Sequence, residues 1–185
     1  SNQSIQIEFN IEAVSNLMPV WLGERTGMIN SKDLASFDPS NNRWMVKDSL
    51  NPWYVVHGST VKGEASKMVF SKTNKPNTAV SNTTYKIEIK PNAVYYLPFT
   101  IAGSAKSKEQ AMSSYNQIKN AAASLLAIKK KRVLNLNQYS TLTLNDNAIA
   151  TSFEWLKYNS DWLTQDVEGI GKGVVAGLPD YPWWF

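Results

Sequence analysis

Short stretches of alternating apolar and polar residues predict β-strands in the first hundred residues. Ser4–Phe9 places Ile5, Ile7 and Phe9 on one face of a strand, and Tyr85–Ile89 shows the same alternation. Further strand candidates are Trp44–Val46, Trp53–His57, Lys67–Phe70 and Ala93–Ala102. Pro98 lies inside the last of these and predicts an edge, a bulge or a break there. The pattern indicates an antiparallel sheet of about five to seven short strands.

A helical period replaces the alternation over residues 107–131. Apolar residues recur there at spacings of four and three, at Ala111, Tyr115, Ile118, Ala122 and Leu125. Ser107 followed by Gln110 is typical of a capping box, and the basic residues 129–132 suit the negative end of a helix dipole. The spacing predicts a helix over 107–131.

Two further elements are expected after this helix. Leucines 134, 136, 142 and 144 alternate with polar residues on either side of Asn137–Ser140, which predicts a β-hairpin. Ile149, Phe153 and Leu156 form a helical face in residues 147–165. Phe153 and Trp155 also alternate as they would in a strand. A β-hairpin over residues 147–165 is therefore the alternative to the preferred helix. The fold class that follows is α+β with an antiparallel sheet.

The length of 185 residues fits one domain. We expect a single α+β domain over 1–177, followed by an aromatic C-terminal tail over 178–185. No run of about 18 apolar residues occurs, so we expect no transmembrane segment.

The residue types exclude several kinds of site. The chain has no cysteine, which excludes disulfides, thiolate metal sites and cysteine nucleophiles. His57 is the single histidine, so no two-histidine metal motif exists. We expect no cofactor and no metal.

Charge is segregated along the chain. Residues 60–132 carry a net charge of +10, between blocks of −2 and −4, within a total of +4. Such a block suits an acidic protein surface, another copy of the chain or a nonspecific anionic surface, and pairing of the blocks within the folded chain is the alternative. Only three arginines stand against sixteen lysines, and base-specific readout favours arginine, so specific DNA recognition is not expected.

Aromatic residues are the most unusual part of the composition, with seven tryptophans. Tryptophan is enriched at interfaces because it offers a large rigid contact area and one polar group. The terminal aromatic residues would form an exposed apolar patch unless they dock on something. We therefore expect the partner-binding residues to be Tyr181, Trp183, Trp184 and Phe185, together with Lys129, Lys130, Lys131 and Arg132.

These features favour a non-enzymatic assembly module of a larger particle or surface apparatus, such as a phage tail, a virion or a secretion machine. Its partners would be other proteins or copies of itself, and a virion or cell-surface location is favoured over the cytoplasm. The alternative is an exported ligand- or membrane-surface-binding module, such as an adhesin, a lectin-like protein or a membrane-perturbing toxin. A third hypothesis is a hydrolase that uses His57 with Ser59, or a pair of carboxylates.

Overall fold

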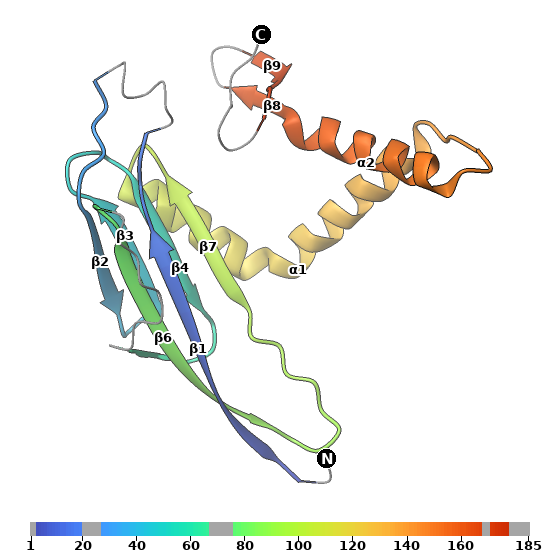
Figure 1. Ribbon diagram of the computed structural model, residues 1–185. Helices are drawn as coiled ribbons and strands as arrows, with labels where there is room; N and C mark the ends of the chain where they lie inside the picture. Colours follow the sequence, from blue (N-terminus) through green and yellow to red (C-terminus); the bar gives the residue numbers. More distant parts are fainter. Residues whose placement is uncertain (1–2, 20–26, 67–75, 168–170, 178–185) are drawn as a thin grey trace. The chain divides into compact units, whose positions relative to one another are not determined.

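The structure is a computed structural model, and it describes residues 3–19, 27–66, 76–167 and 171–177. The chain forms two units, Ser1–Ala121 and Ala122–Phe185, each treated by itself below (Figure 1). In the described ranges there are nine strands in three antiparallel sheets and two helices, which confirms the predicted α+β class. The expectation of one domain over 1–177 stays a prediction.

The first unit holds two sheets. One has the order β1-β6-β5, and the other has the order β2-β3-β4-β7. The strand bounds are β1 Ile5–Ser15, β2 Asp33–Asp38, β3 Arg43–Asp48, β4 Tyr54–Ser59, β5 Glu64–Ala65, β6 Ala79–Ile89 and β7 Phe99–Ser104. The predicted strands at Ser4–Phe9, Trp44–Val46, Trp53–His57 and Tyr85–Ile89 are confirmed.

Hydrogen bonds between side chains connect the two sheets. Trp44 Nε1 on β3 donates to Thr83 Oγ1 on β6 at 2.9 Å. His57 Nε2 on β4 lies 2.9 Å from Ser81 Oγ, also on β6. The layer between the sheets is therefore partly polar, and these hydrogen bonds satisfy the Trp44 N–H and one ring nitrogen of His57.

The apolar core of the first unit lies between sheet β2-β3-β4-β7 and the start of helix α1, which spans Lys108–Gln138. Val56, Ala102, Ala111 and Tyr115 are buried there. Ala111 and Tyr115 are four residues apart, so they lie on the same face of α1 and bring its first turns onto the sheet.

Helix α1 is longer than predicted, and the β-hairpin predicted around Leu134–Leu144 is wrong. The helix passes through residues 132–138 and ends at Gln138, although the backbone at Ala121 departs from helical angles (φ −117°, ψ 16°). Residues 129–138 contain no glycine or proline. Once a helix has nucleated, each further residue that is fixed adds one hydrogen bond, which offsets its entropic cost, so a short alternation does not stop the helix.

The second unit contains the remainder of α1, helix α2 (Asn147–Leu163) and the strand pair β8 (Thr164–Val167) and β9 (Gly171–Val174). The preferred helix over 147–165 is thus confirmed. Its N-cap is Asp146, whose Oδ1 accepts hydrogen bonds from the backbone N–H of Ala148 and Ile149 at 2.8 and 3.3 Å.

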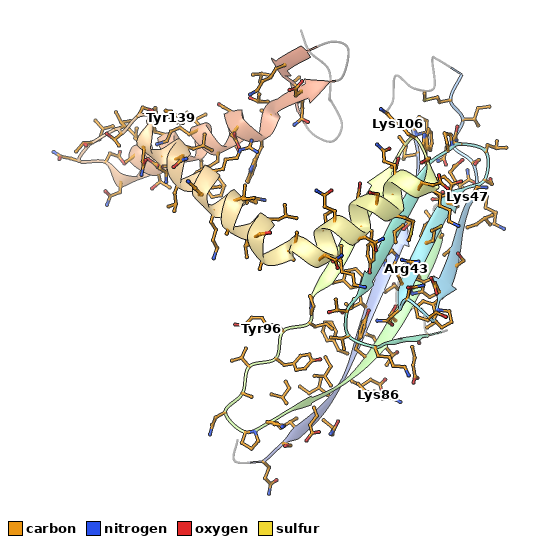
Figure 2. The ribbon with its side chains drawn as sticks, turned by 180° about the vertical axis from the view of Figure 1, so that it is seen from behind. Arg43, Lys47, Lys86, Tyr96, Lys106 and Tyr139 are labelled. Carbon is orange, nitrogen blue, oxygen red and sulfur yellow. The ribbon has the colours of Figure 1, made fainter. Side chains whose placement is uncertain are left out.

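The strand predicted over Ala93–Ala102 is correct only in its second half. Residues 93–98 form no strand, and Tyr96 projects outward from them (Figure 2). β7 begins at Phe99, directly after Pro98, because proline cannot donate to a strand ladder. The predicted strand Lys67–Phe70 and the tail over 178–185 lie outside the described residues. No described helix is both long enough and apolar enough to cross a membrane.

Candidate binding surface

The second unit buries very little apolar surface. Within its described residues, Val175 is the one hydrophobic residue classed as buried, at 2% exposure. Large exposed apolar residues are instead spread over both helical segments and their connection: Leu125, Leu126, Ile128, Leu134, Tyr139, Leu142, Leu144, Ile149, Trp155, Leu156 and Trp162. Exposed apolar area of this density is typical of a surface that another molecule covers.

Three aromatic side chains form a row along α2, termed here the aromatic stripe: Trp155, Tyr158 and Trp162. Their spacing of three and four residues places them on one helix face. The rings of Trp155 and Tyr158 lie 6.0 Å apart at 85°, and those of Trp155 and Trp162 lie 6.5 Å apart at 70°. These edge-to-face contacts hold the row in order, while both tryptophans remain 53% exposed.

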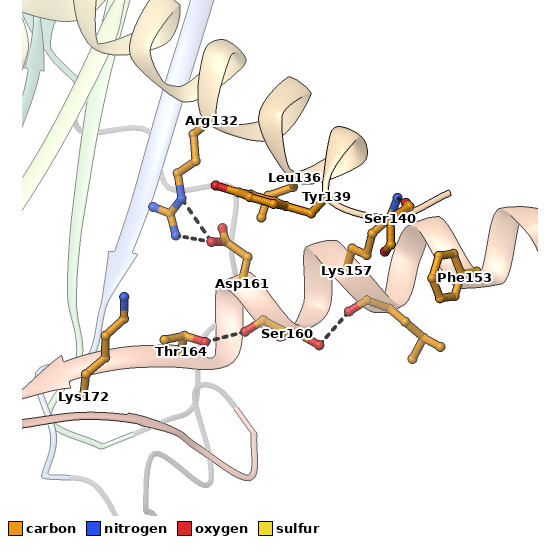
Figure 3. Close-up of a pocket in the computed structure, with 11 residues that line it drawn as sticks. Arg132, Leu136, Tyr139, Ser140, Phe153, Lys157, Ser160, Asp161, Thr164 and Lys172 are labelled. Carbon is orange, nitrogen blue, oxygen red and sulfur yellow. Dashed lines mark hydrogen bonds and ion pairs between the residues drawn. The ribbon is translucent and has the colours of Figure 1, made fainter. Parts of the chain in front are cut away.

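The opposite face of α2 borders a hollow of about 530 Å³ between α2 and the second half of α1 (Figure 3). An ion pair spans the two helices there. Arg132 Nε and Nη2 donate to the same oxygen, Asp161 Oδ1, at 3.1 and 2.7 Å. The hollow is therefore the inner side of a helical hairpin that this pair joins.

Other polar groups around the hollow are already engaged. Lys157 Nζ donates to the carbonyl oxygen of Ser140 at 2.8 Å and lies 2.9 Å from Glu154 Oε1. The hydroxyls of Ser160 and Thr164 donate to main-chain carbonyls of Leu156 and Ser160 at 2.8 and 2.7 Å. The Lys157–Ser140 contact joins α2 to the connection before it, and the other contacts lie within α2 and its C-terminal end.

The predicted basic residues fall into two groups. Arg132 takes part in the ion pair with Asp161, whereas Lys129, Lys130 and Lys131 are exposed on α1. Lys129 and Lys130 flank a second, apolar hollow of about 380 Å³ lined by Leu126, Val133 and Leu134. The other predicted partner-binding residues, Tyr181, Trp183, Trp184 and Phe185, lie outside the described residues.

His57 is held inside the first unit and pairs with a different serine from the one expected. Ser59 Oγ donates to the carbonyl oxygen of Pro98 at 2.6 Å, while Ser81 Oγ lies against His57 Nε2. His57 is 3% exposed, and burial lowers its pKa from 6.5 to about 4. Its buried Nδ1 has no hydrogen-bond partner among the described residues, so none of their carboxylates orients the ring as in a serine hydrolase.

Sequence reasoning missed two of these features. The aromatic stripe could have been found from its helical spacing once 147–165 was taken as a helix. The His57–Ser81 pair could not have been found from the sequence, because local patterns do not show which strands of different sheets lie against each other. In the parts of the chain that the structure describes, no group of three or more histidine, aspartate or glutamate residues is arranged to hold an ion.

Comparison of the chain with protein-family models, curated proteins and solved structures gives no match.

Proposed function

We propose that the chain is a non-enzymatic assembly module, a structural component of a larger particle or surface apparatus such as a phage tail, a virion or a secretion machine. Its second unit docks on a protein partner or on another copy of the chain. The observation that supports this most directly is the aromatic stripe, in a unit whose described residues include a single buried hydrophobic residue, Val175.

The energy available from this surface is substantial. A half-exposed tryptophan leaves roughly 100 Å² of ring surface in water, worth about 2–3 kcal/mol when it is covered, at about 25 cal/mol per Å². Tryptophan and tyrosine also lose little conformational entropy on binding, so they often dominate interface energetics. Trp155 and Trp162 would together contribute about 5 kcal/mol before the entropic cost of association.

The basic cluster and the tail complete the proposed contact. Lys129, Lys130 and Lys131 are exposed and would meet an acidic surface of the partner. The tail residues Tyr181, Trp183, Trp184 and Phe185 would dock in a pocket of the neighbour. Removing residues 178–185 is therefore expected to weaken assembly while the far-ultraviolet circular dichroism of the fold is kept.

The test is the mass in solution, measured by size-exclusion chromatography with light scattering over a range of protein concentrations. The wild-type chain is expected to grow in mass with concentration, and the double variant Trp155→Ser/Trp162→Ser to lose most of that growth. Leu50→Ser is the matched control, because Leu50 is an exposed apolar residue of the first unit. Growth of the double variant beyond a dimer, at the concentrations at which the wild-type chain assembles, would rule out the stripe as the contact.

A second candidate function is an exported module that binds a membrane surface. The observation that favours it is the apolar hollow flanked by Lys129 and Lys130, which could accept an acyl chain beneath an anionic headgroup. Co-sedimentation with vesicles of anionic and of neutral phospholipid separates it from the first proposal. Binding to anionic vesicles alone, lost in Lys129→Ala/Lys130→Ala, would favour the membrane function.

A further inference from the structure

Strand β1 has a strand partner on one side only in the described part of the chain. It pairs with β6 without a bulge over its whole length, from Ile5 opposite Ile89 to Ser15 opposite Ala79. It also forms the end of its sheet, whose order is β1-β6-β5. An edge strand offers a row of backbone N–H and C=O groups to another strand.

This edge lacks most of the features that usually protect one, and its charged residues are Glu8 and Glu12. Natural edge strands are short, carry lysine or proline, or contain a bulge that twists them away. β1 is 11 residues long, and residues 3–15 contain no lysine, arginine or proline. The first half of the strand projects beyond sheet β2-β3-β4-β7 as a two-stranded ribbon with β6 (Figure 1).

Apolar side chains accompany the open edge. Ile5, Ile7 and Phe9 lie on one face of β1 and are 47%, 40% and 47% exposed. Gln6 and Glu8 lie on the other face. On this same face of the sheet, Ile7 of β1 lies opposite Ile87 of β6, and Phe9 of β1 lies opposite Tyr85 of β6. Both pairs are apolar. A strand added at the free edge would cover the remaining flank of these side chains.

We propose that β1 of a second copy pairs with this edge, antiparallel and around a two-fold axis at Ile7. In this register Ile7 faces its own copy, Ile5 faces Phe9, and Gln6 faces Glu8. Ile5, Ile7 and Phe9 then each meet an apolar residue, and the Glu8 carboxylate meets the side-chain amide of Gln6. One strand supplies both sides of the contact, as a two-fold interface requires.

Other registers are less favourable. An axis at Glu8 would place two glutamates directly opposite each other, and like charges in that position destabilise a strand pair. An axis at Phe9 would use Asn10–Ala13, which are half-buried, whereas residues 3–9 are exposed throughout. The register at Ile7 uses the most accessible part of the edge and forms a continuous sheet of six strands from two copies.

The absence of cysteine allows a direct test by single-cysteine cross-linking. Directly opposite residues of an antiparallel pair have Cα atoms about 4.5–5.5 Å apart, within disulfide range. Ile7→Cys is expected to give a covalent dimer under mild oxidation, seen on a non-reducing gel. Ile5→Cys and Phe9→Cys are expected to cross-link little alone but efficiently when mixed.

Leu50→Cys, at a site of 75% exposure, measures cross-linking by random collision. A dimer yield for Ile7→Cys no higher than for Leu50→Cys would overturn the contact, and a stronger self-cross-link of Phe9→Cys would overturn the register. Ile7→Lys is expected to remove self-association through β1, because two like charges would face each other across the axis.

This contact does not rest on the proposed function, since it uses the first unit alone. The Ile7→Cys cross-link is therefore expected to persist when combined with Trp155→Ser/Trp162→Ser. Loss of the cross-link in that combination would overturn the proposal that β1 pairs independently of α2.

Discussion

At the scale of single residues, burial of His57 makes the first unit sensitive to acid. The ring is neutral in the folded chain, with a pKa of about 4, whereas an unfolded histidine titrates near 6.5. Above pH 6.5 the ring is neutral in both states and contributes no pH dependence. As the pH falls from 6.5 toward 4, the unfolded state takes up a proton that the folded state does not, so the free energy of unfolding falls.

The expected loss is about 1.4 kcal/mol for each pH unit in this window, or about 3 kcal/mol by pH 4. Urea unfolding followed by fluorescence at pH 7, 5.5 and 4.5 measures it. His57→Gln removes the titrating ring and leaves an amide that can still bond to Ser81. A pH dependence as steep in this variant as in the wild type would contradict the assignment to His57.

At the scale of elements, the N-cap of α2 is expected to contribute measurably to the stability of this helix, because packing contributes little to it. No residue of α2 is buried, so packing adds less than in an ordinary helix. Asp146→Ala removes the acceptor for the N–H groups of Ala148 and Ile149 and is expected to destabilise the helix by about 1 kcal/mol. Asp146→Asn keeps an acceptor and is the control.

Thermal unfolding followed by circular dichroism at 222 nm, under conditions where the chain is monomeric, measures this change. The alanine variant is expected to lose helicity at a lower temperature than the asparagine variant. Equal transitions for the two variants would mean that the cap does not support α2.

At the scale of the whole molecule, the two units are expected to differ in stability. Core residues such as Val56 and Tyr115 are buried in the first unit, while α2 has none. Backbone amides of α2 should therefore exchange with solvent faster than those of β3 and β4 when the chain is dilute. If α2 is covered on assembly, its exchange should slow as the protein concentration rises.

Hydrogen exchange with mass spectrometry at low and high concentration makes this comparison. Amides of β3 and β4 serve as the internal reference, since their burial does not depend on a partner. Protection of α2 equal to that of β3 in the dilute chain would contradict the difference between the units.

Local patterns were sufficient for most elements and insufficient for the extent of α1. Alternation at Ile5–Phe9 and Tyr85–Ile89 identified two strands, and the spacing of Ala111 and Tyr115 identified a helix. The leucines at 134 and 136 were assigned to a strand because an alternation of two residues is too short to reveal that a helix continues through it.

The sequence by itself determined the α+β class, the positions of β1, β3, β4 and β6, the start of α1, the position of α2, and the absence of any thiol chemistry, since these depend on local periodicity and residue type. Only the tertiary structure decided that β1 pairs with β6, that His57 meets Ser81 and that Trp155 and Trp162 remain exposed. Periodicity defines which face of an element is apolar. Which distant segment covers that face, and which face stays uncovered, depends on the packing of the whole chain.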